Sequence, residues 1–177
     1  MYHLAQIFGI LAITKMTQIE NMQICPQYIP DKLFKEILDK MPICTVDIAL
    51  FNQKKNKILL CKRSNKPLKG VFLTNGGRLL KNEQLEDCAV RQASLELGIS
   101  IDKSKLIFGG VTNEITDSSI FDNVNYHNVD IFFGYILDEL TPIQLDKQHS
   151  EFKWFSIQEK EFHPFVRKII DVLVPKL

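Results

Sequence analysis

The sequence has few cysteines, and none of them is spaced as in a metal or redox site. The four cysteines of the 177-residue chain lie far apart, with no CxxC pair and no histidine at zinc-like spacing. Their spacing argues against a zinc knuckle and against a dithiol redox motif. We expect reduced thiols in the interior of a cytoplasmic protein. The four residues are Cys25, Cys44, Cys61 and Cys88.

The chain also lacks an excess of charge of one sign. Lysine and arginine number 22 against 21 aspartate and glutamate residues, which gives a net charge of +1. No overall electrostatic field then favours nucleic acid or an anionic membrane, so neither is expected as a partner. Ligand selectivity must come from a local site.

A hydrophobic run long enough to span a bilayer is absent as well. The N-terminal run from Tyr2 to Thr14 is broken by Gln6 and Gly9, and no lysine or arginine precedes it. A transmembrane helix and a signal peptide are therefore disfavoured. We expect residues 1–27 to form an arm that packs or is disordered, and residues 28–177 to form a single domain.

Hydrophobic periodicity predicts helices on both sides of a mixed β-sheet. Apolar residues at helical spacing predict short helices, and alternating or continuous apolar runs predict strands. The predicted helices cover residues 31–41 and 165–173, and the predicted strands cover 43–51, 57–61, 106–114, 129–136 and 152–155. The first two strands flank a polar turn and should form a hairpin. The fold class is therefore α/β, with a mixed sheet flanked by helices.

The segment from Gly76 to Ile99, GGRLLKNEQLEDCAVRQASLELGI, carries the strongest pattern in the chain. Its apolar residues recur at four-residue steps and predict a helix with one narrow apolar face. The glycine pair predicts a turn before it, Asn82 is a candidate N-cap, and Gly98 is a candidate C-terminal stop. On the polar side of this helix, Glu96 can reach back toward the glycine-rich loop.

This segment resembles a Nudix box. The matching positions are Gly77, Glu83, Arg91, Glu96 and Gly98, at the spacing of that motif. The chain as a whole is similar to Nudix hydrolases, and within them most similar to the GDP-mannose mannosyl hydrolases. That similarity covers residues 42–154 and includes LLCKRSNKP before the box and DKQHSEFKW after it. It implies a Nudix-type α/β/α sandwich.

The box departs from the general Nudix pattern in the way that this branch does. Gln92 and Leu95 stand where the general box has glutamates, so Glu96 alone can support about one divalent ion. Mg²⁺ prefers six oxygen ligands, and Mn²⁺ is an alternative. The resemblance implies that the Gly76 carbonyl and the Gln148 side chain are the protein's other ligands. Diphosphate oxygens and water would fill the remaining positions.

The resemblance also implies roles for residues outside the helix. His149 is implied as the general base that activates water, and imidazole suits that task at neutral pH. Arg63 and Arg78 would contact the diphosphate, and Asp47 would contact the substrate or orient the base. The ordinary alternatives are a surface histidine, two solvated arginines and an unremarkable acid at a strand end.

The remaining box residues are expected to be structural, and two positions depart from the branch. Gly77, Glu83, Arg91 and Gly98 should shape the segment, with Glu83 and Arg91 tying its loop to its helix. Family members usually have a proline where Asn75 stands and a tyrosine where Asn128 stands. Tyr126 is a candidate to supply the hydroxyl that Asn128 lacks.

These residues leave three functions open. The first is a Mg²⁺-dependent hydrolase of GDP-mannose or a related nucleotide sugar, in which water attacks the anomeric carbon and releases a nucleoside diphosphate. The second is a Nudix pyrophosphohydrolase that attacks phosphorus. The third is a non-catalytic Nudix domain that binds a nucleotide or a partner protein. The resemblance further implies a homodimer, while no sequence feature identifies the base or the sugar.

Overall fold

The computed structural model describes residues 28–177. The predicted N-terminal arm, with Cys25, lies outside the described residues. Cys44, Cys61 and Cys88 are free thiols, as the sequence predicts. None of the helices formed by residues 28–177 is long and apolar enough to cross a membrane.

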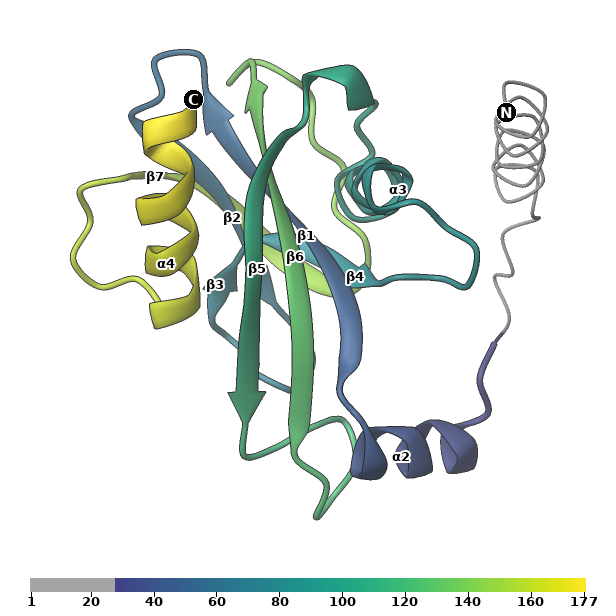
Figure 1. Cartoon of the computed structure of the whole chain (residues 1–177). Helices are drawn as coiled ribbons and strands as arrows, with labels where there is room; N and C mark the ends of the chain where they lie inside the picture. Colours follow the sequence, from purple (N-terminus) through teal and green to yellow (C-terminus); the bar gives the residue numbers. More distant parts are fainter. Residues whose placement is uncertain (1–27) are drawn as a thin grey trace, which may run out of the picture.

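A seven-stranded mixed sheet forms the centre of the protein (Figure 1). Its main path runs in the order β3-β2-β1-β6-β5, while β4 pairs with β1 and β7 pairs with β2. The strands are β1 (Ile43–Asn52), β2 (Lys57–Arg63), β3 (Phe72–Leu73), β4 (Asn75–Arg78), β5 (Ile107–Thr116), β6 (Tyr126–Leu137) and β7 (His149–Ser156). Strands β1 and β2 pair antiparallel, which confirms the predicted hairpin. Strand β1 is parallel to β6, so the sheet is mixed.

Helices cover both faces of this sheet, as predicted (Figure 1). They are α2 (Asp31–Lys40), α3 (Leu85–Leu97) and α4 (Pro164–Leu173), with short 3-10 turns at Lys103–Lys105 and Val174–Lys176. Because successive side chains of a strand point to opposite faces, β1 supplies both layers of the core. Ala49 and Phe51 pack with α4, while Ile48 and Leu50 pack with α3. The predicted α/β architecture is confirmed.

Strand β4 replaces the turn that the sequence predicts at the glycine pair. Gly76 lies opposite Asp47 of β1, and Gly77 lies opposite Val46, in an antiparallel ladder. The expectation of a turn at these residues was wrong because glycine also suits a strand where another chain segment approaches closely.

Helix α3 begins at Leu85, with Gln84 rather than Asn82 at the N-cap position and no side-chain cap bond. Asn82 instead adopts a φ of 68° in the preceding turn, a conformation that asparagine tolerates better than most residues. The predicted C-terminal stop is confirmed, since Gly98 follows the helix in the left-handed conformation with a φ of 67°.

Helix α2 covers one end of the sheet near the turn between β5 and β6 (Figure 1). Pro30 precedes the first residue of α2, and the apolar side of this helix packs against the end of the sheet. Leu38 is buried with Ile43 and Val124, and Phe34 packs against this small cluster. Helix α2 therefore packs against the end of the sheet at which β1 begins.

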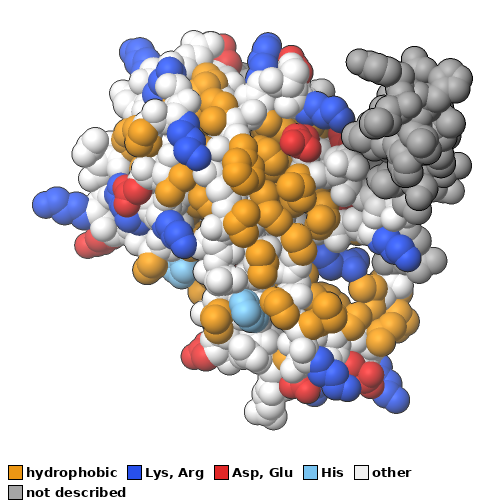
Figure 2. Space-filling model, viewed as in Figure 1, with side chains coloured by type: hydrophobic (Ala, Val, Ile, Leu, Met, Phe, Trp, Pro, Cys, Tyr) orange, Lys and Arg blue, Asp and Glu red, His pale blue; other side chains and the backbone are white. Residues whose placement is uncertain are grey.

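Strand β5 is an edge strand whose outward face is apolar. Figure 2 shows apolar side chains gathered over this strand between α4 and α3. Phe108, Val111 and Ile115 of β5 are each more than half exposed. We call these three residues the β5 apolar row.

The packing of α3 leads to a matched pair of predictions. Leu97 is fully buried in the cluster on the α3 side of the sheet, whereas Leu95, two residues earlier, is 61% exposed. Leu97→Ala should lower the free energy of unfolding by about 2–5 kcal/mol because it leaves a cavity. Leu95→Ala should change it by less than about 0.5 kcal/mol. Urea unfolding of both variants measures this, and equal effects would contradict the packing described.

Candidate functional site

A cavity of about 250 Å³ opens on the α4 side of the sheet, where β2 and β4 separate. Strand β1 pairs with β2 at Leu50 and Phe51, but with β4 from Thr45 to Ile48. The segment that joins β2 to β3 passes over the gap between them. Polar residues lining the cavity are Thr45, Asp47, Arg63, Asn65, Lys66, Thr74, Glu114, Thr116, Tyr126, Asn128 and Gln148.

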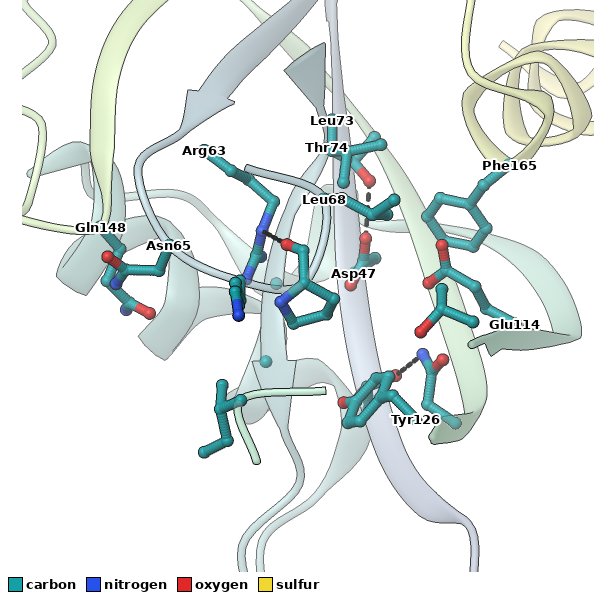
Figure 3. Close-up of a pocket in the computed structure, with 18 of the residues that line it drawn as sticks. Asp47, Arg63, Asn65, Leu68, Leu73, Thr74, Glu114, Tyr126, Gln148 and Phe165 are labelled. Atoms are coloured by element: carbon teal, nitrogen blue, oxygen red, sulfur yellow. Dashed lines mark hydrogen bonds between the residues drawn. The ribbon is translucent and has the colours of Figure 1, made fainter. Parts of the chain in front are cut away.

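The two sides of the cavity differ in chemistry (Figure 3). Arg63, Asn65 and Gln148 lie on one side, and Glu114 and Tyr126 lie on the other. The first side offers a guanidinium and amide groups, which suit an anion such as a diphosphate. The second side offers a carboxylate and a hydroxyl.

Arg63 ends β2 and is held at the cavity by the loop that follows it. Its Nε donates a hydrogen bond of 3.0 Å to the Pro67 carbonyl, and its backbone bonds to Gly70 and Val71 at the far end of the loop. One edge of the guanidinium is thus anchored while the residue still lines the cavity. This places Arg63 where an anionic ligand could reach it.

Asp47 lies on the cavity floor between the two sides (Figure 3). Thr74 Oγ1 donates a hydrogen bond of 2.6 Å to its Oδ2. Burial raises the pKa of Asp47 to about 6, and this rise is limited by the hydrogen bond from Thr74, by the neighbouring Asp130 and by the charge of Arg63. At neutral pH the carboxylate is therefore mostly ionised and can accept hydrogen bonds from a ligand.

A chain of hydrogen bonds links Thr45 of β1 to β6. Asn128 Nδ2 donates to Thr45 Oγ1 at 2.8 Å, and Thr45 Oγ1 donates to Asp130 Oδ1 at 2.8 Å. Burial, followed by the charge of Asp47, raises the pKa of Asp130 well above its ordinary value. A neutral Asp130 avoids the repulsion that two adjacent buried carboxylates would have. Asn128 therefore has a structural role at the position where the similar mannosyl hydrolases have a tyrosine.

Glu96 reaches back from α3 to β4. Its Oε2 accepts hydrogen bonds from Asn75 Nδ2 at 3.0 Å and from the Gly76 N–H at 3.2 Å. Burial raises the pKa of Glu96 to about 7, and the charges of Asp47 and Asp146 add to the rise. Asn75, which departs from the branch's proline, thus supplies a side-chain donor that proline lacks.

The donors around Glu96 fit a hard divalent cation. Glu96 is 6% exposed and lies near two further carboxylates, so a positive charge would relieve their repulsion. Within residues 28–177, no group of three or more His, Cys, Asp and Glu side chains is arranged to hold a metal ion. A cation here would therefore need backbone, amide, substrate or water oxygens as well. Gln148 lines the cavity and can supply its amide oxygen, since its Nε2 is bonded to Asp146 Oδ2.

His149 is the first residue of β7 rather than part of the preceding loop, where the sequence had placed it. Its Nδ1 lies 2.8 Å from Asp146 Oδ1. Because an ionised carboxylate only accepts, Nδ1 carries the proton and Nε2 is left as an acceptor. The Asp146 N–H donates in turn to the Glu96 carbonyl at 3.1 Å, so the Asp146–His149 pair is tied to α3.

The structure holds Glu83 and Arg91 together as an ion pair. Arg91 Nε lies 2.6 Å from Glu83 Oε1, and Arg91 also donates to the Arg78 carbonyl at 3.1 Å. The Leu80 N–H donates to Glu83 Oε2 at 2.9 Å. Glu83 precedes α3 rather than lying on it, so these bonds join the box loop, the end of β4 and the helix.

The predicted site residues are only partly brought together. Asp47, Arg63, Gly76 and Gln148 line the cavity, and so does Gly77. Glu96 contacts the Gly76 N–H from the α3 side, and His149 lies beside Gln148 at the start of β7. The side chain of Arg78 lies over the ring of Phe34 in α2, 5.9 Å from its centre, and does not line the cavity.

Sequence reasoning missed several residues of the site. Asp146 positions His149, Thr45 and Glu114 line the cavity, and the buried Asp130 accepts a hydrogen bond from Thr45. Asp146 could have been noticed as an acid three residues before the histidine. The other three stand on strands distant in the sequence, and only the β1–β6 and β5–β6 registers bring them together. Tyr126, the candidate for the missing hydroxyl, does line the cavity.

Comparison with known proteins identifies the family of the chain. The NUDIX domain family matches residues 41–173, which is three quarters of the chain. This chain belongs to the Nudix family. Nudix hydrolases generally use divalent ions such as Mg²⁺ or Mn²⁺, which is consistent with the oxygen donors around Glu96.

Two curated relatives of this Nudix protein are informative. The low-salt glycan biosynthesis protein Agl8 of Haloferax volcanii is 31% identical over 147 residues, which cover 82% of this chain and 90% of that protein. The ADP-ribose pyrophosphatase of Methanocaldococcus jannaschii is 44% identical over 57 residues, which cover 32% of this chain and 33% of that protein.

Solved structures show the same Nudix fold. The MutT NUDIX hydrolase from Burkholderia pseudomallei superimposes with a TM-score of 0.63 at 19% sequence identity, covering 76% of this chain and 99% of that chain. The α/β/α sandwich inferred from the resemblance is thus confirmed.

The Glu83–Arg91 ion pair predicts a specific pH dependence of stability. Burial alone would raise the pKa of Glu83, but the hydrogen bond from Arg91 and that from the Leu80 N–H outweigh it and lower the pKa. The pair therefore stabilises the protein above the unfolded-state pKa of about 4.3, and the stabilisation is lost as pH falls through the lower folded-state pKa. Glu83→Gln should cost about 1–3 kcal/mol at pH 7, with a smaller cost toward pH 3.

Denaturant unfolding at several pH values tests this difference. Glu161→Gln is the matched control, because Glu161 is exposed. A cost at Glu83 that stays constant from pH 7 to pH 3 would contradict the ion pair as the cause.

Proposed function

We propose that this Nudix protein is a hydrolase of a nucleotide sugar, in which water attacks the anomeric carbon and a nucleoside diphosphate departs. The observation that carries the proposal is the Asp146–His149 pair. Its 2.8 Å hydrogen bond leaves Nε2 of His149 as an acceptor, and its backbone link to Glu96 places it beside the box. An oriented neutral imidazole is suited to accept a proton from water.

The helix itself offers little alternative base chemistry. Gln92 is uncharged and packs against Gly77, and Leu95 is 61% exposed to solvent. Glu96 accepts two hydrogen bonds and is the carboxylate best placed to hold a cation with Gly76 and Gln148. Bound Mg²⁺ would neutralise the diphosphate and make it a better leaving group. His149 is then a better candidate for the general base than Gln92, Leu95 or Glu96 of α3.

Arg63 supports the departure of an anion in this proposal. It lines the cavity on the same side as Gln148, and a guanidinium can pair with phosphate oxygens through two hydrogen bonds. Arg78 remains a proposed second contact. Reaching the cavity would require its side chain to leave the ring of Phe34. Asp47, on the cavity floor, would accept a hydrogen bond from the substrate.

The sugar part of the proposal is supported by one relative. Agl8 is named for glycan biosynthesis, and it matches 82% of this chain. GDP-mannose is the specific candidate implied by the sequence resemblance. A homodimer is proposed on the same basis, and the β5 apolar row is a surface that a second copy could cover. A cytoplasmic location is proposed from the spacing of the cysteines.

Hydrolysis in ¹⁸O-labelled water tests the bond that is broken. Carbon attack places the label in the free sugar and leaves the nucleoside diphosphate unlabelled. We expect this result for GDP-mannose or for a related nucleotide sugar found in a substrate screen with Mg²⁺. Mass spectrometry of both products provides the measurement. Label in a phosphate product would overturn carbon attack.

Replacing His149 tests the proposed base. His149→Ala should lower kcat by about 100-fold or more, because a general base typically contributes a factor of about 10² to 10⁴. His127→Ala is the matched control, since His127 makes only a long 3.5 Å contact with Asn113 near the surface. Steady-state rates of both variants at saturating substrate and Mg²⁺ provide the comparison. Equal rates for the His149 variant and the wild type would exclude His149 as the base.

A pyrophosphohydrolase that attacks phosphorus is the second candidate. The local similarity to an ADP-ribose pyrophosphatase favours it, although that match covers a third of each protein. It predicts a nucleoside monophosphate among the products, with ¹⁸O on phosphorus. The third candidate, a non-catalytic binding domain, is motivated by Gln92 and Leu95 in the box. It predicts no turnover of any nucleotide sugar or dinucleotide at millimolar Mg²⁺.

A further inference from the structure

The far side of the cavity presents hydrogen-bond acceptors that have no partner among the described residues. The buried side-chain atoms without a hydrogen bond in residues 28–177 are Asn128 Oδ1, Glu114 Oε1 and Asp130 Oδ2. Asn128 is 4% exposed, and both Asn128 and Glu114 line the cavity. A buried acceptor without a partner costs free energy, so an accumulation of them beside a cavity points to a ligand that donates.

The direction of the hydrogen bonds determines which atom of Asn128 remains for a ligand. Its Nδ2 is used by Thr45 Oγ1, whose single proton goes to Asp130 Oδ1. The amide must therefore present its oxygen, because a reversed amide would place two acceptors, Asn128 Oδ1 and Thr45 Oγ1, together without a proton between them. Asn128 thus offers an acceptor at the cavity.

Glu114 lies directly across the strand pair from Asn128. The β5–β6 register pairs these two residues, so their side chains share one face of the sheet. Figure 3 shows Glu114 next to Phe165, across the cavity from Arg63 and Gln148. Burial and the charge of Asp47 raise the pKa of Glu114 to about 7. No arginine or lysine forms an ion pair with it among the described residues.

We infer that Glu114 and Asn128 form the sugar-recognition side of the cavity and accept hydrogen bonds from ring hydroxyls of the glycosyl group. This inference rests on the proposed function, in which the diphosphate lies beside Arg63 and Gln148. A glycosyl group attached to that diphosphate would extend across the floor, past Asp47, to the two acceptors. Hydroxyls are donors, and a site built to bond them discriminates strongly against analogues that lack them.

The binding test compares nucleotide sugars with their nucleoside diphosphates. Full-length His149→Ala protein, in which turnover is suppressed, is titrated with GDP-mannose, GDP-glucose, UDP-glucose and ADP-glucose in Mg²⁺, and with GDP, UDP and ADP. Adding Glu114→Gln should weaken the tightest-binding sugar nucleotide about tenfold and leave its nucleoside diphosphate within about twofold. Glu161→Gln, an exposed residue, is the matched control and should change neither affinity.

A second arm uses analogues of that sugar nucleotide, each lacking one ring hydroxyl. At least one deoxy analogue should bind the Glu114-intact protein about tenfold more weakly than its parent, and this loss should nearly vanish with Glu114→Gln. Equal weakening of the sugar nucleotide and the nucleoside diphosphate would assign Glu114 to the nucleoside and overturn the inference. No weakening of either ligand, or no binding of any of the four sugar nucleotides, would also overturn it.

The outcome is separable from that of the proposed reaction. Phosphorus attack in the ¹⁸O experiment would overturn the proposed chemistry, yet a selective loss of sugar-nucleotide affinity with Glu114→Gln would still support the recognition role. Carbon attack together with unchanged affinities in the Glu114→Gln variant would support the proposed chemistry and overturn the recognition role of Glu114.

Discussion

The site depends on the close approach of β4 to both of its neighbours. A methyl group at Gly76 would lie 2.0 Å from Asp47 Oδ1 and 2.6 Å from the Val46 carbonyl, and one at Gly77 would lie 2.2 Å from Gln92 Nε2. Successive strand residues face opposite sides, so the missing side chain at Gly76 allows β4 to approach Asp47 of β1, and the missing side chain at Gly77 allows it to approach Gln92 of α3. With side chains at both positions, β4 could not lie this close to β1 and α3. Glu96 could not then reach the Gly76 N–H, and the cavity would lose part of its wall.

Burial of acids without matching bases is the second constraint on the site. Asp47, Glu96, Glu114 and Asp130 all have raised pKa values, and burial is the largest cause for each. The protein lowers the cost in different ways: threonine hydroxyls donate to Asp47 and Asp130, and Asn75 donates to Glu96. Among residues 28–177, no group donates a hydrogen bond to Glu114 Oε1, and a cation or a donating ligand would stabilise these four acids. These four buried acids therefore favour the binding of ligands that carry positive charge or donate hydrogen bonds.

In the altered box, cation binding and base catalysis are assigned to different segments of the chain. Glu96 is the carboxylate that remains on α3 at the box positions, and a single carboxylate cannot both bind several cations and act as a base. The proposed role of α3 is therefore limited to holding Glu96. The loop before β7 then becomes important, because the Asp146 N–H bonds to the Glu96 carbonyl while the Asp146 carboxylate orients His149. The proposed cation ligand, Glu96, and the proposed base, His149, are thus linked through a single residue. A substitution at Asp146 would disturb both.

The sequence by itself determined the α/β class, the hairpin, the helix with its glycine stop and the family, because these depend on local periodicity and on a motif with fixed spacing. It misplaced the glycine pair in a turn, Asn82 at the N-cap and His149 in a loop, because local propensity does not reveal which strand will pair there. Only the tertiary structure decided that Glu114, Asn128, Thr45 and Asp130 share one floor. The parallel pairing of β1 with β6 joins segments more than 80 residues apart, and their register follows from packing across the whole sheet rather than from any local pattern.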